Sequence, residues 1–191
     1  TIFGRKFKKL RYGENPHQES SVYISDYDDR NLGFTQLSGR DLSYNNYNDI
    51  FASLEILESI KGKAGTVIIK HANPCGVSEN KSAIDSFKNA FNCDPLSAFG
   101  GVIACNYKIN KRIALEISKN FLEVILAKKF DADALKILKK KKNLRIIDIS
   151  NYKLKGISSI KSFDSSFLIQ NRDKIVLDKK KLRCVTKLKP N

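Results

Sequence analysis

The stretch that decides the fold is a short apolar run that ends in a lysine and a histidine, Thr66-Val67-Ile68-Ile69-Lys70-His71-Ala72-Asn73-Pro74-Cys75-Gly76. Its β-branched residues, 66–69, predict a buried strand. Asn73-Pro74 and Gly76 then predict a turn. Because ligands of open α/β sheets lie beyond the carboxyl ends of strands, the sequence predicts a site at Lys70 and His71. Histidine moves protons near neutral pH; the alternative is an exposed lysine beside a hydrogen-bonded loop histidine.

Predicted helices and strands alternate around this strand. The spacing of apolar residues predicts helices over 50–60, 79–91, 110–118 and 132–140. Apolar runs predict further strands over 21–25, 102–105, 121–127 and 144–149, with weaker ones over 166–170 and 174–177. The expected helix caps are one of Asn45, Asn46 and Asn48, then Asn110 and Asp131. The alternation predicts an α/β fold in which helices pack on a mostly parallel sheet.

Composition restricts the partners. The chain has 191 residues and a net charge of +15, and no apolar run is long enough to span a membrane. The charge favours anionic partners, but the lysines are scattered, and aromatic residues are not interleaved with them as a single-strand nucleic-acid surface requires. We therefore interpret the charge mainly as a solvated surface. The alternative is a basic nucleic-acid-binding module without catalysis.

The cysteines and histidines indicate neither a disulfide framework nor a metal site. Cys75, Cys93, Cys105 and Cys184 match no disulfide scaffold and no zinc pattern with close pairs. Free thiols in a reducing cytoplasm are expected. The two histidines, at positions 17 and 71, are too few for a histidine-rich metal site.

Other positions are candidates for ligand binding. Arg11 lies in a polar loop, 10–18, and suits a phosphate or carboxylate. Asn45 either caps a helix or contacts a ligand. Gly100-Gly101 forms a tight turn or lets the backbone approach a ligand. Glu123 is a carboxylate in an otherwise apolar strand, so it must be exposed at an edge or held by a partner.

Taken together and in order, these motifs resemble the formyltransferase region of the bifunctional purine biosynthesis enzymes, which act on aminoimidazole carboxamide ribonucleotide (AICAR). The motifs are residues 10–18, 42–46, 70–76, 94–101, 123–127 and 185–187. The resemblance covers essentially the whole chain and implies a three-layer α/β/α fold similar to that of cytidine deaminases. It implies that 1–10 are a linker from an upstream inosine monophosphate cyclohydrolase domain. Residues 11–150 are then a deaminase-like subdomain, and 151–191 an extension towards a second half.

The implied activity is transfer of a formyl group from 10-formyltetrahydrofolate, the co-substrate, to the 5-amino group of AICAR during inosine monophosphate synthesis. By resemblance, His71 accepts the proton and Lys70 stabilises the transition state. The positions that contact AICAR in the family are Arg11, Tyr12, Asn45, Phe99, Gly100 and Glu123. The family needs no metal here and has an active site shared across a homodimer. We expect no nucleic-acid or membrane partner, and weak or no activity for these 191 residues alone.

The residue types fit this chemistry. The amine of AICAR is a weak nucleophile because it is conjugated with the ring, so a general base such as His71 assists its attack. A lysine ammonium stabilises the oxyanion that forms from the formyl carbonyl. Zinc deamination is the rival on a similar fold, and it needs His-x-Glu followed by Pro-Cys-x-x-Cys. Here Asn73 replaces the glutamate and Ser78 the second thiolate, so neither the base nor the zinc site can form at this place.

Overall fold

The computed structural model describes residues 4–24, 32–154, 158–173 and 183–188. The chain divides into two compact units, Thr1–Leu154 and Lys155–Asn191. The strand expected over 174–177 lies outside the described residues. No helix in the described part of the chain has the length and apolar character needed to cross a membrane.

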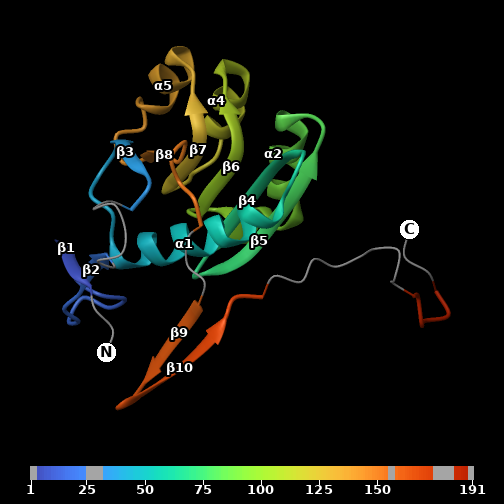
Figure 1. The fold of residues 1–191 in the computed structure, drawn as a ribbon. Coiled ribbons are helices and arrows are strands. Elements are labelled where there is room, and N and C mark those ends of the chain that lie inside the picture. Colours follow the sequence, from blue (N-terminus) through green and yellow to red (C-terminus); the bar gives the residue numbers. More distant parts are fainter. Residues whose placement is uncertain (1–3, 25–31, 155–157, 174–182, 189–191) are drawn as a thin grey trace. The chain divides into compact units, whose positions relative to one another are not determined.

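A six-stranded sheet forms the centre of the first unit (Figure 1). In spatial order its strands are β3 (Thr35–Ser38), β8 (Arg145–Asp148), β7 (Val124–Phe130), β6 (Val102–Ile109), β4 (Ala64–Lys70) and β5 (Asn73–Asn80). Only the pairs β6–β7 and β7–β8 are parallel, whereas β3–β8, β6–β4 and β4–β5 are antiparallel. The α/β class is confirmed, but the expected predominance of parallel strands is wrong. The sequence pattern does not reveal β5, whose hairpin with β4 reverses the chain before β6. It also does not reveal β3, which pairs with β8 in the antiparallel direction.

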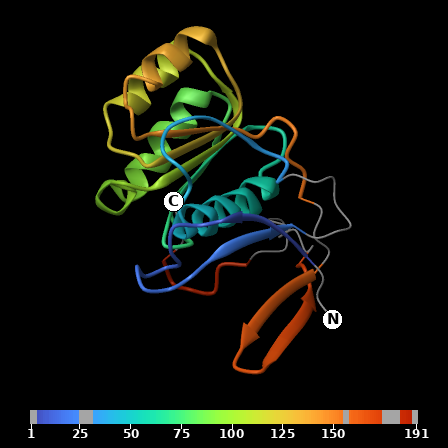
Figure 2. The same cartoon turned by 90° about the vertical axis from the view of Figure 1, so that its left-hand side faces the viewer.

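Helices cover both faces of this sheet, which confirms the three layers. Helix α1 (Tyr44–Ser59) packs on one face through Ile50, Leu54 and Leu57. The other face carries α2 (Ala83–Cys93), α3 (Pro95–Ala98), α4 (Lys111–Ser118) and α5 (Ala132–Leu138). Figure 2 shows α1 on one side of the sheet and the larger helical layer on the other. The apolar side chains of β4, β6 and β7 alternate between the two faces, so each central strand contributes to both cores.

The helix caps agree with the sequence in part. Asn110 caps α4 as predicted, since its side chain accepts from the amide of Ile113 at 3.0 Å. Asp131 occupies the cap position of α5 but makes no capping hydrogen bond; it pairs with Lys108 at 3.1 Å. Helix α1 is capped by Ser43 instead of an asparagine. Asn46 completes a capping box with Ser43, which satisfies two amides at the start of α1.

The turn after β4 lies two residues earlier than predicted. Lys70 pairs with Asn73, so His71 and Ala72 alone form the hairpin turn. Pro74 and Gly76 belong to β5, and Cys75 between them has no partner in the register because the pairing shifts there. Proline is tolerated because β5 is an edge strand, where a missing N–H need not pair.

One two-stranded hairpin precedes the strands of this sheet in the chain, and another follows them. In the first unit, β1 (Arg5–Lys9) pairs with β2 (Ser21–Ile24), so part of the segment that the resemblance implies as a linker forms a strand. In the second unit, β9 (Ser158–Phe163) pairs with β10 (Ser166–Asn171). The latter confirms the strand predicted over 166–170.

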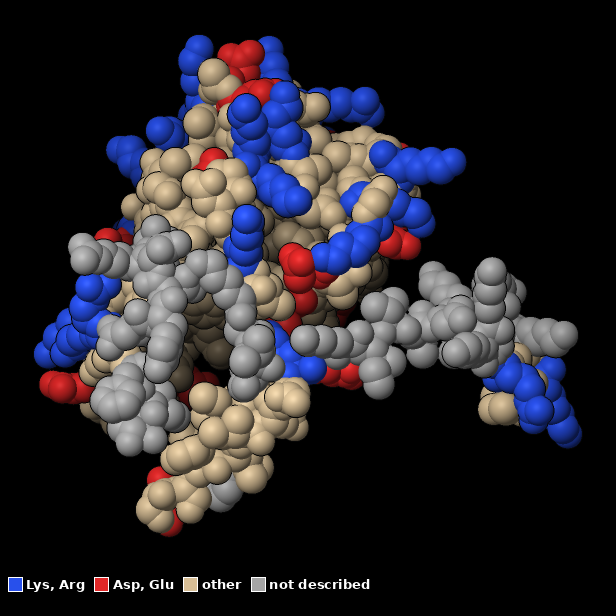
Figure 3. Space-filling view, viewed as in Figure 1, with Lys and Arg blue, Asp and Glu red and all other residues tan. Residues whose placement is uncertain are grey.

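Lysine and arginine side chains are spread over the viewed face of the first unit, with acidic side chains between them (Figure 3). Several pair locally, such as Lys61 with Glu58 at 2.6 Å and Lys63 with Glu79 at 3.1 Å. These exposed pairs contribute little to stability. On this face the charge has the scattered arrangement that the sequence indicates.

Gly76 of β5 lies directly against the backbone of α2, and we expect its replacement to destabilise the fold. A Cβ atom built at Gly76 would lie 1.9 Å from the carbonyl oxygen of Ala90. Because the obstacle is backbone, Gly76→Ala should lower the free energy of unfolding by about 3 kcal/mol or more. The matched control is Gly62→Ala, whose Cβ would meet nothing within 4 Å, although its φ of +79° carries a smaller cost. Urea unfolding measures both, and equal losses would contradict the close contact.

The four thiols are free and should differ in their reactivity. Burial raises the pKa of Cys105 to about 12 and also raises that of Cys75. Hydrogen bonding with Thr186 lowers the pKa of the exposed Cys184. Because the thiolate is the reactive form, iodoacetamide at pH 8 should modify Cys184 fastest, Cys75 slowly and Cys105 only after unfolding. Peptide mass spectrometry gives the order, and early modification of Cys105 would contradict it.

Candidate active site

Four strand ends and one helix start meet at one edge of the sheet. Since β4 is antiparallel to β6, the carboxyl end of β4 lies beside the amino ends of β6, β7 and β8. The register pairs Ile69 with Val102, Val102 with Val124, and Val124 with Arg145. Lys70 and His71 therefore lie at the carboxyl end of their strand, as predicted. Glu123 and Arg145, in contrast, lie at the amino ends of β7 and β8.

A pocket of about 420 Å³, here called the central pocket, lies at this edge. It brings together six of the predicted site residues, Tyr12, Asn45, Lys70, His71, Gly100 and Glu123. The other lining residues are Arg40, Ser43, Asn46, Asp49, Phe121, Leu122, Asn143 and Arg145. Positions that are far apart in the chain thus line one cavity, and most of its lining residues are polar.

His71 sits in a strained turn. Its φ is 52° and that of Ala72 is 57°, values of the left-handed region that suit glycine. Such a conformation costs a non-glycine residue about 1–3 kcal/mol, and residues held in it cluster at functional sites. Two contacts hold the turn: the amide of Ala72 donates to Asp49 Oδ1 at 2.7 Å, and Asn73 Nδ2 donates to the carbonyl of His71 at 2.9 Å.

Lys70, at the same edge, contacts the segment that precedes β6. Its Nζ donates to the carbonyl oxygen of Phe99 at 2.8 Å, which fixes the ammonium beside the Phe99–Gly100 peptide. The ring of Phe99 lies 5.0 Å from that of Phe121, and both rings are exposed. The amide of Gly100 donates to Phe121 at 2.9 Å. Phe99 is thus near the central pocket without lining it, while Gly100 lines it directly.

Glu123 is held by partners, one of the two options that its apolar strand allowed. Asn46 Nδ2 donates to Glu123 Oε2 at 3.0 Å, and Arg145 Nη1 lies 3.8 Å from the same oxygen. The Glu123 side chain remains 47% exposed, so it retains room to accept further hydrogen bonds. Burial lowers the pKa of Arg145, and the charge of Glu123 acts against this effect.

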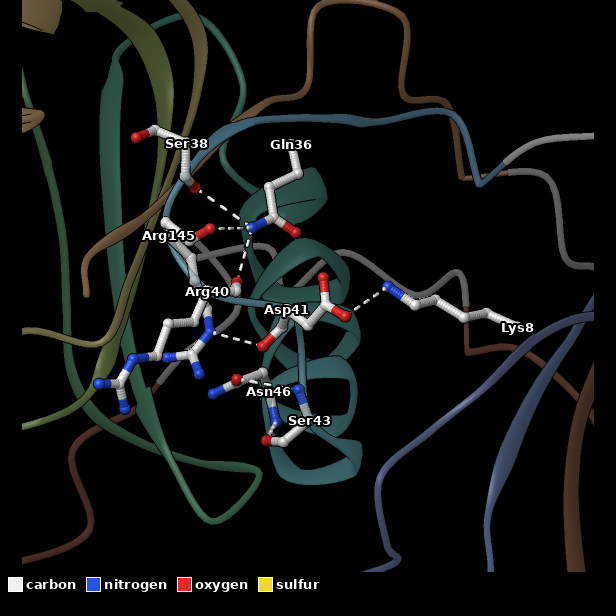
Figure 4. Close-up of polar contacts among 9 residues, drawn as sticks. Lys8, Gln36, Ser38, Arg40, Asp41, Ser43, Asn46 and Arg145 are labelled. Carbon is white, nitrogen blue, oxygen red and sulfur yellow. Dashed lines mark hydrogen bonds and ion pairs between the residues drawn. The ribbon is translucent and has the colours of Figure 1, made fainter. Parts of the chain in front are cut away.

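Sequence reasoning missed Asn46, Asp49, Arg40 and Arg145 as pocket residues. Figure 4 shows the polar contacts that the loop before α1 makes with Lys8, Gln36 and Arg145. Arg145 Nε donates to the carbonyl of Asp41 at 3.1 Å, and Lys8 Nζ lies 3.3 Å from Asp41 Oδ2. Gln36 Nε2 donates to the carbonyl of Arg40 at 2.7 Å. These bonds fix the loop whose last residue, Ser43, caps α1.

A second, basic pocket of about 280 Å³ adjoins the central one and shares Tyr12, Arg40, Ser43 and Arg145 with it. Its remaining lining residues are Lys8, Lys9, Leu10, Arg11, Asp41 and Leu42. Arg11, the remaining predicted site residue, lies here, with its guanidinium 5.7 Å from the centre of the Tyr12 ring. Five cationic side chains face one carboxylate, so the basic pocket favours an anion.

Two further pockets lie among the described residues. An outer pocket of about 540 Å³ also contains Lys70 and His71, and its other lining residues are Asn73, Pro74, Cys75, Asp94, Leu96 and Ser97. Lys70 and His71 therefore border cavities on two sides. A distal pocket of about 690 Å³ contains Lys61, Lys128 and Tyr152 but none of the predicted site residues. Among the described residues, no group of three or more histidine, cysteine, aspartate or glutamate side chains could hold a metal ion.

Comparison with known families gives a match over the whole chain: the model of the AICARFT/IMPCHase bienzyme covers residues 1–191. The chain belongs to the AICARFT/IMPCHase bienzyme family. In this member of the bienzyme family, five of the six motifs that carry the resemblance contribute residues to this edge of the sheet or to the loops next to it. The sixth motif, 185–187, lies in the second unit.

Relatives in the bienzyme family are longer than this chain. The bifunctional purine biosynthesis protein PurH of Elusimicrobium minutum is 43% identical over 185 residues, which are 97% of this chain and 35% of that protein. PurH of Nostoc punctiforme is 37% identical over 191 residues, 100% of this chain and 37% of that protein. The chain thus spans little more than a third of the length of these relatives.

Solved structures give weaker similarity. Acinetobacter baumannii RibD aligns with a TM-score of 0.40 and 14% identity, over 52% of this chain and 35% of that one. The dCMP deaminase of cyanophage S-TIM5 aligns with a TM-score of 0.35 and 12% identity, over 54% of this chain and 93% of that one. The assignment to the bienzyme family rests on the sequence comparisons.

Proposed function

We propose that this chain carries the nucleotide-binding and proton-transfer part of an AICAR formyltransferase, with 10-formyltetrahydrofolate as the formyl donor. One observation carries the proposal: Lys70 and His71 border both the central pocket and the outer pocket. A group transfer between two substrates requires reactive side chains that reach both of them, and this placement satisfies that requirement.

The nucleotide fits the central and basic pockets. We place its phosphate in the basic pocket, where Arg11, Arg40 and Arg145 supply planar donors suited to phosphate oxygens. The carboxamide and amino groups then lie in the central pocket, where the half-exposed Glu123 accepts hydrogen bonds from them. Tyr12 borders both pockets, at the position of the ribose between them.

The formyl donor is placed in the outer pocket, beside Leu96 and Cys75. The exposed Phe99 and Leu96 offer apolar surface close to that pocket, which suits a flat heterocycle. In this arrangement the formyl carbon reaches the amine of AICAR beside Lys70 and His71. Residues outside this chain are expected to complete the donor site, in a homodimer with a shared active site.

The reaction follows from these positions. The 5-amino nitrogen attacks the formyl carbon and forms the new C–N bond, while His71 accepts the proton from the amine. The carbonyl oxygen becomes an oxyanion, which the Lys70 ammonium stabilises. When the carbonyl re-forms, the bond to the donor nitrogen breaks, and tetrahydrofolate leaves with the proton. The products are the formamido ribonucleotide and tetrahydrofolate.

Formyl transfer by the intact protein is the test of this proposal. AICAR and 10-formyltetrahydrofolate are supplied together, and the formation of tetrahydrofolate is followed by absorbance. Turnover that requires both substrates supports the proposal. A well-folded protein without turnover, whose binding to mixed-sequence RNA weakens steeply with added salt, would favour the nucleic-acid-binding alternative.

We expect residues 1–191 by themselves to bind AICAR but to transfer formyl groups weakly or not at all. The reason is that the chain holds the central and basic pockets, whereas it spans only 35% of the length of its Elusimicrobium minutum relative. Calorimetry with AICAR and the absorbance assay measure the two properties separately. Turnover equal to that of the intact protein would contradict this expectation.

A further inference from the structure

The contact between α1 and the turn at the end of β4 is made by Asp49, which has no role in the proposed reaction. Asp49 lies in α1, and its Oδ1 accepts the amide hydrogen of Ala72 at 2.7 Å. Among the described residues, Asp49 forms no ion pair with a lysine or arginine. Its carboxylate is half-buried and lines the central pocket. A partly buried carboxylate needs a hydrogen-bond partner, and Asp49 has one in the amide of Ala72.

We propose that Asp49 is a positioning residue that holds His71 and Ala72 in their left-handed backbone conformation and thereby aims the His71 side chain between the two pockets. The inference rests on the proposed formyl transfer for its effect on activity. The turn is a two-residue hairpin loop with both φ values positive, a type that normally requires asparagine and glycine. His-Ala does not favour this conformation by itself, so an outside contact must stabilise it.

The direction of the His71 side chain depends mainly on the conformation of the turn backbone. Its side chain is exposed, so packing does not fix its direction. Its backbone is held by the pairing of Lys70 with Asn73, by the bond from the Asn73 side chain to the His71 carbonyl, and by the Asp49 bond to Ala72. Burial raises the pKa of Asp49, whereas the amide of Ala72 and the charge of His71 act against this effect.

Three variants of the intact protein separate positioning from charge. Asp49→Ala removes the acceptor, and we expect kcat to fall about 10- to 100-fold with little change in KM for AICAR, because misplacement of a catalytic group by about 1 Å costs this much. Asp49→Asn keeps an oxygen acceptor and should retain kcat within about threefold. Adding Ala72→Gly to Asp49→Ala should restore most of the lost kcat, because glycine adopts positive φ without steric cost. The control is Asn48→Ala, an exposed neighbour in α1.

Hydrogen exchange at the amide of Ala72, measured by NMR, tests the same contact without activity. Exchange should be at least about tenfold faster in Asp49→Ala than in wild type and little changed in Asp49→Asn. The proposal is overturned if Asp49→Ala keeps wild-type kcat and exchange. It is also overturned if Asp49→Asn is as slow as Asp49→Ala and Ala72→Gly gives no recovery, since the charge would then be what matters. If the wild type transfers no formyl group, the proposed function fails, and the exchange rates alone decide the role of Asp49.

Discussion

The His71→Ala variant of the intact protein is expected to lose about 10²- to 10⁴-fold in kcat for formyl transfer, the range that general base catalysis supplies. The amine of AICAR is a weak nucleophile, so the reaction depends on removal of its proton during attack. In the described structure His71 is the histidine that borders both the central and the outer pocket. Its removal should leave the binding of AICAR nearly intact, because the basic pocket and Glu123 are unchanged.

His17→Ala is the matched control for this variant. His17 is also exposed and lies in the loop that carries Arg11 and Tyr12, but it lines neither of the two pockets that border His71. Its replacement should leave kcat within about twofold of wild type, as for surface substitutions away from a site. Stopped-flow or steady-state absorbance gives kcat, and calorimetry gives the affinity for AICAR. Turnover that survives in His71→Ala would keep the reaction and remove His71 as its base.

Lys70→Met should lower kcat by about 10²- to 10³-fold, the loss typical when one donor to a developing oxyanion is removed. Methionine keeps the length and apolar stem of the side chain, so the packing at the end of β4 changes little. The ammonium of Lys70 is already oriented by its hydrogen bond to the carbonyl of Phe99. An oriented charge stabilises the transition state without further reorganisation, which is why we expect a large effect on kcat.

The division of the effect between kcat and KM tests the role of Lys70. If the ammonium acts on the oxyanion, KM for AICAR stays close to wild type while kcat falls. If KM rises and kcat is unchanged, Lys70 binds the ground state instead, and the proposed role is wrong. Lys128→Met serves as the control, because Lys128 is an exposed lysine that lines the distal pocket. It should leave both constants unchanged within about twofold.

The local pattern was sufficient to predict where Lys70 and His71 lie in the sheet. An apolar β-branched run that stops at Lys70-His71 indicates a strand end, and the structure places both residues at the edge where the pockets lie. The pattern failed at 73–76, where proline and glycine indicate a turn although the residues belong to an edge strand. An edge position removes the hydrogen-bonding requirement that makes proline unfavourable in a strand. Whether a strand lies at an edge is decided by the whole sheet.

The missed pocket residues have weaker local signals. Ser43 and Asn46 have the spacing of a capping box, and that pattern would have favoured Ser43 as the cap. Glu123 directly precedes the apolar strand β7, and Arg145 is the first residue of β8. Opposite charges at the starts of two neighbouring parallel strands could have indicated an ion pair. Asp49 carries no such signal, because its contact with Ala72 depends on how α1 packs against β4.

Strand β5 also bears on how the protein behaves at high concentration. An exposed edge strand is a template on which a second chain can add a strand, and this is a common start of aggregation. Pro74 presents no N–H to such a chain, and the shift in register at Cys75 interrupts the regular row of groups. The residues that make β5 hard to recognise in the sequence therefore protect this edge of the sheet from pairing with a second chain. A variant that restored a regular edge would be less soluble.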